Sequence, residues 1–72
     1  MTSNIRLLDV VALCEEWPER GLRRGQVGTV VEVLPPGAIE VEFSDDEGRT
    51  LALLAVPAER LMVLHYDLAD TA

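Results

Sequence analysis

The sequence contains few of the residue types on which most catalytic and metal sites depend. It has a single cysteine, Cys14, and a single histidine, His65, so no internal disulfide can form and too few soft ligands are present for a zinc site. A lone cysteine also favours a reducing compartment. The only aromatic residues are Trp17, Phe43 and Tyr66, so a core built from this chain must be mainly aliphatic.

Sequence motifs that usually indicate an enzyme or a calcium site are also missing. The chain has no glycine-rich phosphate loop, no serine-centred elbow and no EF-hand spacing in the acidic segment 44–48. Cys14 and His65 are the only thiol and imidazole. Cys14 ends an apolar run beside Glu15 and Glu16, which favours a buried structural cysteine over a nucleophile. We therefore expect no catalytic residue, no metal, no cofactor and no enzymatic activity.

Positive charge is scarce, since six arginines and no lysine stand against thirteen acidic residues, for a net charge of −7. Binding to a phosphate backbone requires cationic neutralisation, so this balance argues against nucleic acid and favours a basic protein partner. The first six residues lack the basic and apolar regions of a signal peptide, and no apolar run reaches the roughly 18 residues of a membrane helix. We expect a cytoplasmic protein of bacterial character.

The chain is organised around residues 25–34, a glycine-containing turn followed by a strand rich in valine. Gly25 and Gly28 predict a tight turn and then a bulge or a close backbone approach. Period-two alternation places Val27, Thr29, Val31 and Val33 on one face, and because neither face is polar we expect both to be largely covered.

Four further segments have the length and composition of strands. In residues 38–43 Ile39, Val41 and Phe43 alternate with Ala38, Glu40 and Glu42, which predicts a half-exposed antiparallel strand. The other three strands are expected at 7–14, 49–56 and 61–66, and a 3₁₀ turn at 57–60. In the strand at 49–56 both faces are apolar, which predicts core on one side and an interface on the other.

The connections contain turn residues of known geometry. Pro35-Pro36-Gly37 predicts a type II turn with a positive φ at Gly37, and residues 44–48 predict a hairpin tip with Gly48 in the left-handed region. Residues 7–66 should form one domain, flanked by a frayed N-terminus at 1–6 and a disordered tail at 67–72.

The ten-residue loop at 15–24 is the candidate binding segment. It carries the only tryptophan and half of the arginines, and these two residue types are enriched at protein-interaction hot spots. The predicted partner-binding residues are Trp17, Arg20, Arg23 and Arg24. In the alternative interpretation Trp17 covers one end of the fold, and the arginines pair with Glu15, Glu16 and Glu19.

The element order resembles an SH3-like small barrel, and Gly25-x-x-Gly28-Thr29-Val30 is similar to the glycine-centred turn of KOW, Tudor-like and CAP-Gly barrels. A pattern over residues 7–64 also resembles an uncharacterised family of small bacterial proteins; its segments are LDVVAL, PExGLxRGQVGTVVE, VEF and GRTxA. The element order implies an all-β fold: a five-stranded, partly open SH3-like barrel with one 3₁₀ turn before the last strand. The resemblance to the uncharacterised family assigns no catalytic residue.

The leading functional hypothesis is a non-enzymatic protein-interaction module that binds another protein, such as a basic one, or a second copy of itself. The resemblance implies a protein encoded nearby, as in antitoxin or immunity pairs. One alternative is a KOW-like nucleic-acid-binding barrel, which requires Arg20, Arg23, Arg24 and Arg49 to converge. Another is an accessory subunit of a metalloenzyme, since nitrile hydratase β subunits contain a similar-looking barrel.

Overall fold

The computed structural model describes residues 5–65, and its regular elements are strands and short 3₁₀ turns. The predicted all-β class is therefore confirmed, and so is a 3₁₀ turn directly before the last strand. In chain order the elements are β1 (Val10–Leu13), η1 (Pro18–Arg20), β2 (Val27–Leu34), β3 (Ala38–Ser44), β4 (Thr50–Pro57), η2 (Ala58–Arg60) and β5 (Leu61–Val63).

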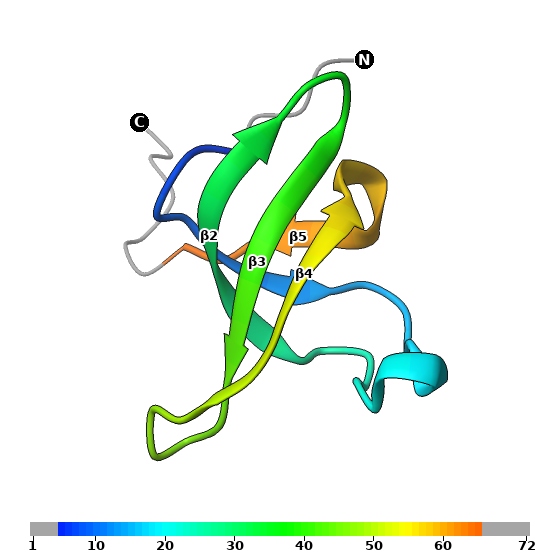
Figure 1. Cartoon of the computed structure of the whole chain (residues 1–72), viewed down its shortest axis with the longest axis vertical. Coiled ribbons are helices and arrows are strands. Elements are labelled where there is room, and N and C mark those ends of the chain that lie inside the picture. The colour runs from blue at the N-terminus through cyan, green and yellow to red at the C-terminus, as the bar shows by residue number, and fades with distance from the viewer. Residues whose placement is uncertain (1–4, 66–72) are drawn as a thin grey trace, which may run out of the picture.

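The five strands form one antiparallel sheet in the order β4-β3-β2-β1-β5. β4 and β5 are the two edges, and the described residues of these strands do not pair with each other, so the sheet is not closed into a barrel. Figure 1 shows β2, β3 and β4 running side by side, with β1 and β5 crossing them at a steep angle. The sheet therefore curls enough to enclose a core.

The core lies on the inner face of this curled sheet. Ile39, Val41 and Phe43 of β3 are buried as predicted, and they pack with residues from every other strand. The rest of the buried cluster consists of Val11, Leu13, Leu22, Val30, Val56 and Leu61. Because no polar side chain is buried within residues 5–65, burial of aliphatic surface and Phe43 stabilises the fold.

The predicted face assignment of β2 is correct only as far as Val30. Gly28 and Val30 face the core, but the register between β2 and β3 shifts between Val30 and Glu32, which leaves Val31 as the extra residue of a bulge. After the bulge Val33 lies opposite the buried Ile39 and thus on the inner side, not on the face of Val27 and Thr29. The prediction that both faces are covered is also wrong, since Val27 and Val31 are exposed.

β1 is shorter than the predicted strand at 7–14. Leu7 and Leu8 form a turn in which Leu8 has a φ of 72°, and the side chain of Asp9 caps this turn by accepting the backbone N–H of Arg6 at 2.8 Å. At the other end the strand stops at Leu13, so Cys14 is exposed and the prediction of a buried cysteine is wrong. The N–H of Cys14 donates to the carbonyl of Arg60.

One of the two hairpin turns differs from its prediction. Gly48 has the predicted positive φ, at 83°. Gly37 does not, and the Pro35–Pro36 peptide bond is cis, so the type II turn is wrong. β4 begins one residue later than predicted and includes Pro57.

The chain ends lie mostly outside the described residues, which leave out 1–4 and 66–72. The predicted tail at 67–72 is among the omitted residues, as is Tyr66 of the last predicted strand. Of the predicted frayed segment, Ile5 is half-buried against the core. β5 itself stops at Val63.

Candidate protein-interaction surface

Large apolar side chains are exposed on the face of the sheet that points away from the core, which we call the outer face. Ala12 of β1 lies directly between Val27 of β2 and Met62 of β5 in the register, so these three share that face. Leu53 of β4 occupies the same face opposite Glu42. Val27 is 45% exposed, and Leu53 and Met62 are each 54% exposed. β4 therefore has core on one side, as predicted, and exposed leucines on the other; that this second side forms an interface stays a prediction.

Three carboxylates, Glu32, Glu40 and Glu42, lie among these apolar side chains. Glu32 and Glu40 are direct cross-strand partners, and Glu42 follows on the same face two residues along β3. Within residues 5–65 none of the three has an ion-pair partner, and Glu42 accepts a hydrogen bond from the Thr50 hydroxyl at 2.5 Å. Like charges in directly opposed positions destabilise a sheet by about 0.2–1 kcal/mol.

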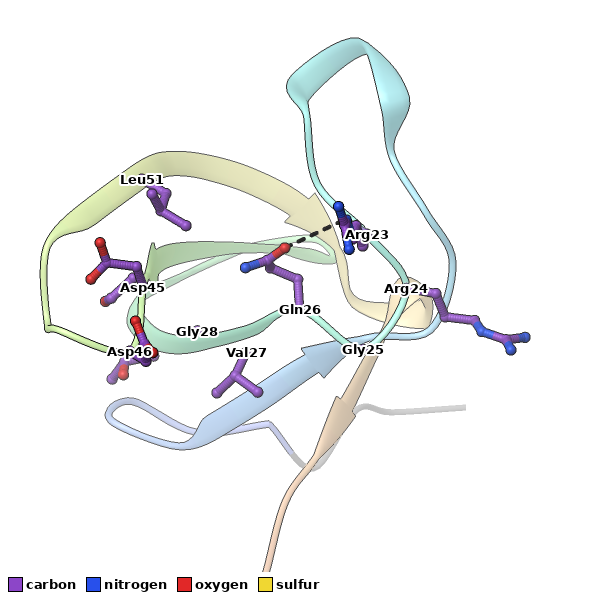
Figure 2. Close-up of a pocket in the computed structure, with 11 residues that line it drawn as sticks. Arg23, Arg24, Gly25, Gln26, Val27, Gly28, Asp45, Asp46 and Leu51 are labelled. Atoms are coloured by element: carbon purple, nitrogen blue, oxygen red, sulfur yellow. Dashed lines mark hydrogen bonds between the residues drawn. The ribbon is translucent and has the colours of Figure 1, made fainter.

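A groove of about 660 Å³ opens at one end of the outer face, between the turn before β2 and the tip of the β3–β4 hairpin. Val27 and Leu51 supply its apolar lining, and Asp45 and Asp46 line it from the hairpin tip. In Figure 2 the side chain of Gln26 extends toward the hairpin side of the groove. Its amide oxygen accepts the backbone N–H of Arg23 at 3.4 Å.

The hairpin tip is held by a network centred on Asp45. Its carboxylate accepts the backbone N–H groups of Glu47 at 2.9 Å and Arg49 at 2.8 Å, and it forms an ion pair with the Arg49 side chain at 2.8 Å. The Arg49 backbone bond is the largest influence that lowers the pKa of Asp45 below its ordinary value, and partial desolvation opposes it. Arg49 also contacts Glu47 at 3.0 Å.

The predicted binding loop is closed by backbone hydrogen bonds. Trp17 and Leu22 exchange N–H···O bonds of 2.8 and 3.1 Å. Where the loop joins the sheet, the N–H of Gly25 donates to the carbonyl of Leu13 at 2.7 Å. Leu22 is buried and Trp17 is half-buried against the core. Both observations agree with the interpretation in which Trp17 covers one end of the fold.

Trp17 contacts an arginine that was not among the residues predicted from the sequence. The guanidinium of Arg60, in η2, lies 5.7 Å from the centroid of the indole ring, within the range of a cation–π contact, and its Nε is 4.0 Å from Glu15. Arg60 is 43 positions further along the chain, so no local pattern could have indicated the contact.

The three predicted arginines of the loop occupy different places. Arg23 and Arg24 line the groove, although Figure 2 shows the Arg24 side chain extending away from it. Arg20 is exposed in η1. Among the described residues none of the three forms an ion pair, so the predicted pairing with Glu15, Glu16 and Glu19 is wrong. Their role in partner binding stays a prediction.

The described residues 5–65 contain no grouping or helix of two further kinds. No three His, Cys, Asp or Glu residues of this range are grouped so that they could hold a metal ion. No helix in the same range is long and apolar enough to cross a membrane.

Comparison with known proteins gives a family but no function. No curated protein and no solved structure matches the chain. A family model described as a domain of unknown function, DUF4926, matches residues 7–63, which include all five strands and both 3₁₀ turns. The chain therefore belongs to the DUF4926 family.

Proposed function

We propose that this protein is a non-enzymatic protein-interaction module whose outer face binds a second protein carrying basic residues around an apolar contact. The observation that carries the proposal is the arrangement of Glu32, Glu40 and Glu42 beside exposed apolar side chains on one open sheet face. A monomeric domain gains nothing from unpaired like charges that face each other, whereas a cationic partner would turn this cost into attraction.

The apolar part of the face suits the centre of such an interface. Val27, Leu53 and Met62 lie on strands of one hydrogen-bonded sheet, so contact with them requires no loop to become ordered. Protein interfaces commonly combine an apolar centre with a polar rim, and the net charge of −7 would accelerate association with a basic protein. A protein encoded nearby, as in antitoxin or immunity pairs, is the first candidate.

The proposed fold type is an opened relative of the SH3-like barrel. The element order and the 3₁₀ turn η2 directly before β5 support it. So do the crossing of β1 and β5 over the other strands and the strand order β4-β3-β2-β1-β5, which would need only β4 and β5 to approach for closure.

Nucleic-acid binding is less well supported than protein binding. Arg49, one of the four arginines that this alternative needs, is already paired with Asp45 and Glu47. Asp45 and Asp46 line the same groove as Arg23 and Arg24, so a phosphate there would meet carboxylates.

Affinity capture from the organism that encodes the protein tests the proposal. We expect the wild-type chain to retain a stoichiometric basic protein, and Val27→Arg to reduce its recovery at least tenfold by placing a cation on the outer face. Leu7→Arg is the matched control, because Leu7 is also exposed but lies in the turn before β1. Circular dichroism would establish that both variants fold.

Two results would contradict the proposal. One is a partner that both variants capture as well as the wild type does. The other is a chain that binds an oligonucleotide at about 50 mM salt and loses that affinity steeply as salt rises, because this would favour the nucleic-acid alternative.

A further inference from the structure

The groove at the end of the outer face has charges of opposite sign on its two walls. Arg23 lines it from the turn before β2, and Asp46 lines it from the β3–β4 hairpin tip. Both residues are exposed, and within residues 5–65 neither forms an ion pair. These two charges are therefore available to a ligand.

The other charged residues of the groove are committed elsewhere or turned away. The Asp45 carboxylate accepts two backbone N–H groups and pairs with the Arg49 side chain at 2.8 Å. Figure 2 shows the Arg24 side chain extending away from the groove. Among the described residues that line the groove, Arg23 and Asp46 are thus the charges that can select a ligand.

Backbone hydrogen bonds hold both walls in place without a ligand. The carbonyl of Arg23 accepts the N–H of Gln26 at 3.0 Å, and the Gln26 amide oxygen accepts the N–H of Arg23. At the hairpin tip the N–H of Gly48 donates to the carbonyl of Asp45 at 3.0 Å, and the N–H of Asp45 donates to the carbonyl of Arg49 at 2.9 Å. A groove organised in advance lowers the entropic cost of binding.

The groove is continuous with the outer face and has the size of a ligand site. Val27 belongs to both, and together with Leu51 it supplies an apolar lining; the two side chains are 45% and 53% exposed. The volume of about 660 Å³ lies within the range of about 300–1,000 Å³ that is usual for ligand sites. A protein bound to the outer face can therefore extend a segment into the groove.

Charge complementarity selects the chemistry of that segment. A ligand with charges of one sign would be attracted by one wall and repelled by the other, whereas a segment with both signs can pair with both walls. In an extended peptide, side chains two residues apart point to the same side and lie roughly 7 Å from each other. Alternate residues of an extended segment can therefore direct an acidic and a basic side chain into the groove.

We propose that the groove binds an extended segment of the basic partner in which an acidic side chain pairs with Arg23 and a basic side chain pairs with Asp46. This inference rests on the proposed function and deepens it, because it states which peptide chemistry is recognised at one end of the outer face.

NMR titration of the full chain with the blocked tripeptide acetyl-Glu-Ala-Arg-amide tests the groove without the natural partner. At up to about 10 mM peptide we expect saturating shifts of the backbone amide signals of Gln26, Val27 and Asp46. The peptides acetyl-Arg-Ala-Arg-amide and acetyl-Glu-Ala-Glu-amide should bind more weakly, because each places a charge against a wall of its own sign.

Two pairs of variants separate the groove charges from the net charge. Arg23→Glu should weaken binding of the mixed-charge peptide by about fivefold, which is the upper range for an exposed ion pair. Arg24→Glu makes the same change on a side chain that extends away from the groove, so it should leave binding unchanged. Asp46→Arg should likewise weaken binding, and Glu16→Arg, in the exposed loop, should not.

Three results would overturn the proposal. They are groove amides that do not shift at about 10 mM peptide, a peptide of one sign that binds as tightly as the mixed one, and an Arg24→Glu variant as impaired as Arg23→Glu. The proposed function is tested separately. A captured partner that is lost with Val27→Arg, but binds Arg23→Glu as well as Arg24→Glu, would overturn the groove assignment and leave the proposed function intact.

Discussion

Replacing Gly28 by alanine tests the packing between β2 and β3 on which the sheet depends. A Cβ at this position would lie 2.5 Å from Val41 Cγ1, 2.9 Å from the Glu42 carbonyl oxygen and 2.9 Å from Phe43 Cδ1. Val41 and Phe43 are fully buried, and the Glu42 oxygen belongs to the paired backbone, so none of these atoms can move aside freely. The strand must therefore shift away from β3.

The change in the free energy of unfolding caused by Gly28→Ala follows from two opposing effects. Overpacking a core position costs about 1–3 kcal/mol, while the loss of glycine's freedom in the unfolded chain returns about 0.4–1 kcal/mol. We expect Gly28→Ala to lower the free energy of unfolding by about 1–2 kcal/mol. At about 4–8 °C per kcal/mol for a domain of this size, the melting temperature should fall by about 5–15 °C.

Gly37→Ala is the matched control for this experiment. Gly37 has no positive φ, and a Cβ there would meet no atom within 4 Å, so only the unfolded-state effect remains. We expect it to raise the unfolding free energy by about 0.4–1 kcal/mol in urea denaturation. If Gly28→Ala is as stable as Gly37→Ala, the close approach of β2 to β3 is not as described and the reasoning fails.

Three other predictions concern stability and pH. Glu40→Gln should raise the free energy of unfolding by about 0.2–1 kcal/mol by removing the repulsion with Glu32, measured in urea, whereas Glu16→Gln in the exposed loop should leave it unchanged. Phe43→Ala should cost about 3–5 kcal/mol, comparable with the roughly 4–11 kcal/mol expected of 72 residues, so its thermal transition should move toward or below 37 °C. Because the folded-state pKa of Asp45 is lowered, its contribution is present above the unfolded value of about 3.9 and is lost as pH falls through the folded pKa. The stability difference between wild type and Asp45→Ala should therefore shrink on acidification below about pH 4, and a difference that grows there would contradict the assignment.

The sequence predicts the fold best where a strand has one solvent-exposed face and one buried face. In β3 the alternation of Ile39, Val41 and Phe43 with two glutamates specifies both the strand and its orientation, and the structure agrees. It is less informative in β2, where valines occupy both faces. The bulge at Val31 reverses the alternation there, and a period-two pattern contains no signal for the inserted residue.

Strand ends were predicted less well, because they depend on single backbone geometries. The run at 7–14 looks continuous, yet the positive φ of Leu8 starts the strand at Val10, and the Asp9 carboxylate that caps the turn is the one local signal for this. Cys14 looked like the last core residue. Its exposure follows from the end of β1 at Leu13, which no composition argument fixes.

The candidate surface could be predicted only in part. The sequence indicated an exposed apolar face on β4 and an acidic protein, but not that Glu32 lies opposite Glu40, since the bulge sets that register. It directed attention to Trp17 and the loop arginines. The contact of Arg60 with Trp17 depends instead on tertiary packing between η2 and the loop.

Hydrogen–deuterium exchange of the complex with the captured partner, compared with the free protein, tests the central claim most directly. The account predicts that protection on binding concentrates in β2 and β3 around Val27, Glu32, Glu40 and Glu42, and that Glu40→Gln weakens the complex while it stabilises the free domain. Protection confined to residues 15–24, with Glu40→Gln binding as tightly as the wild type, would contradict it.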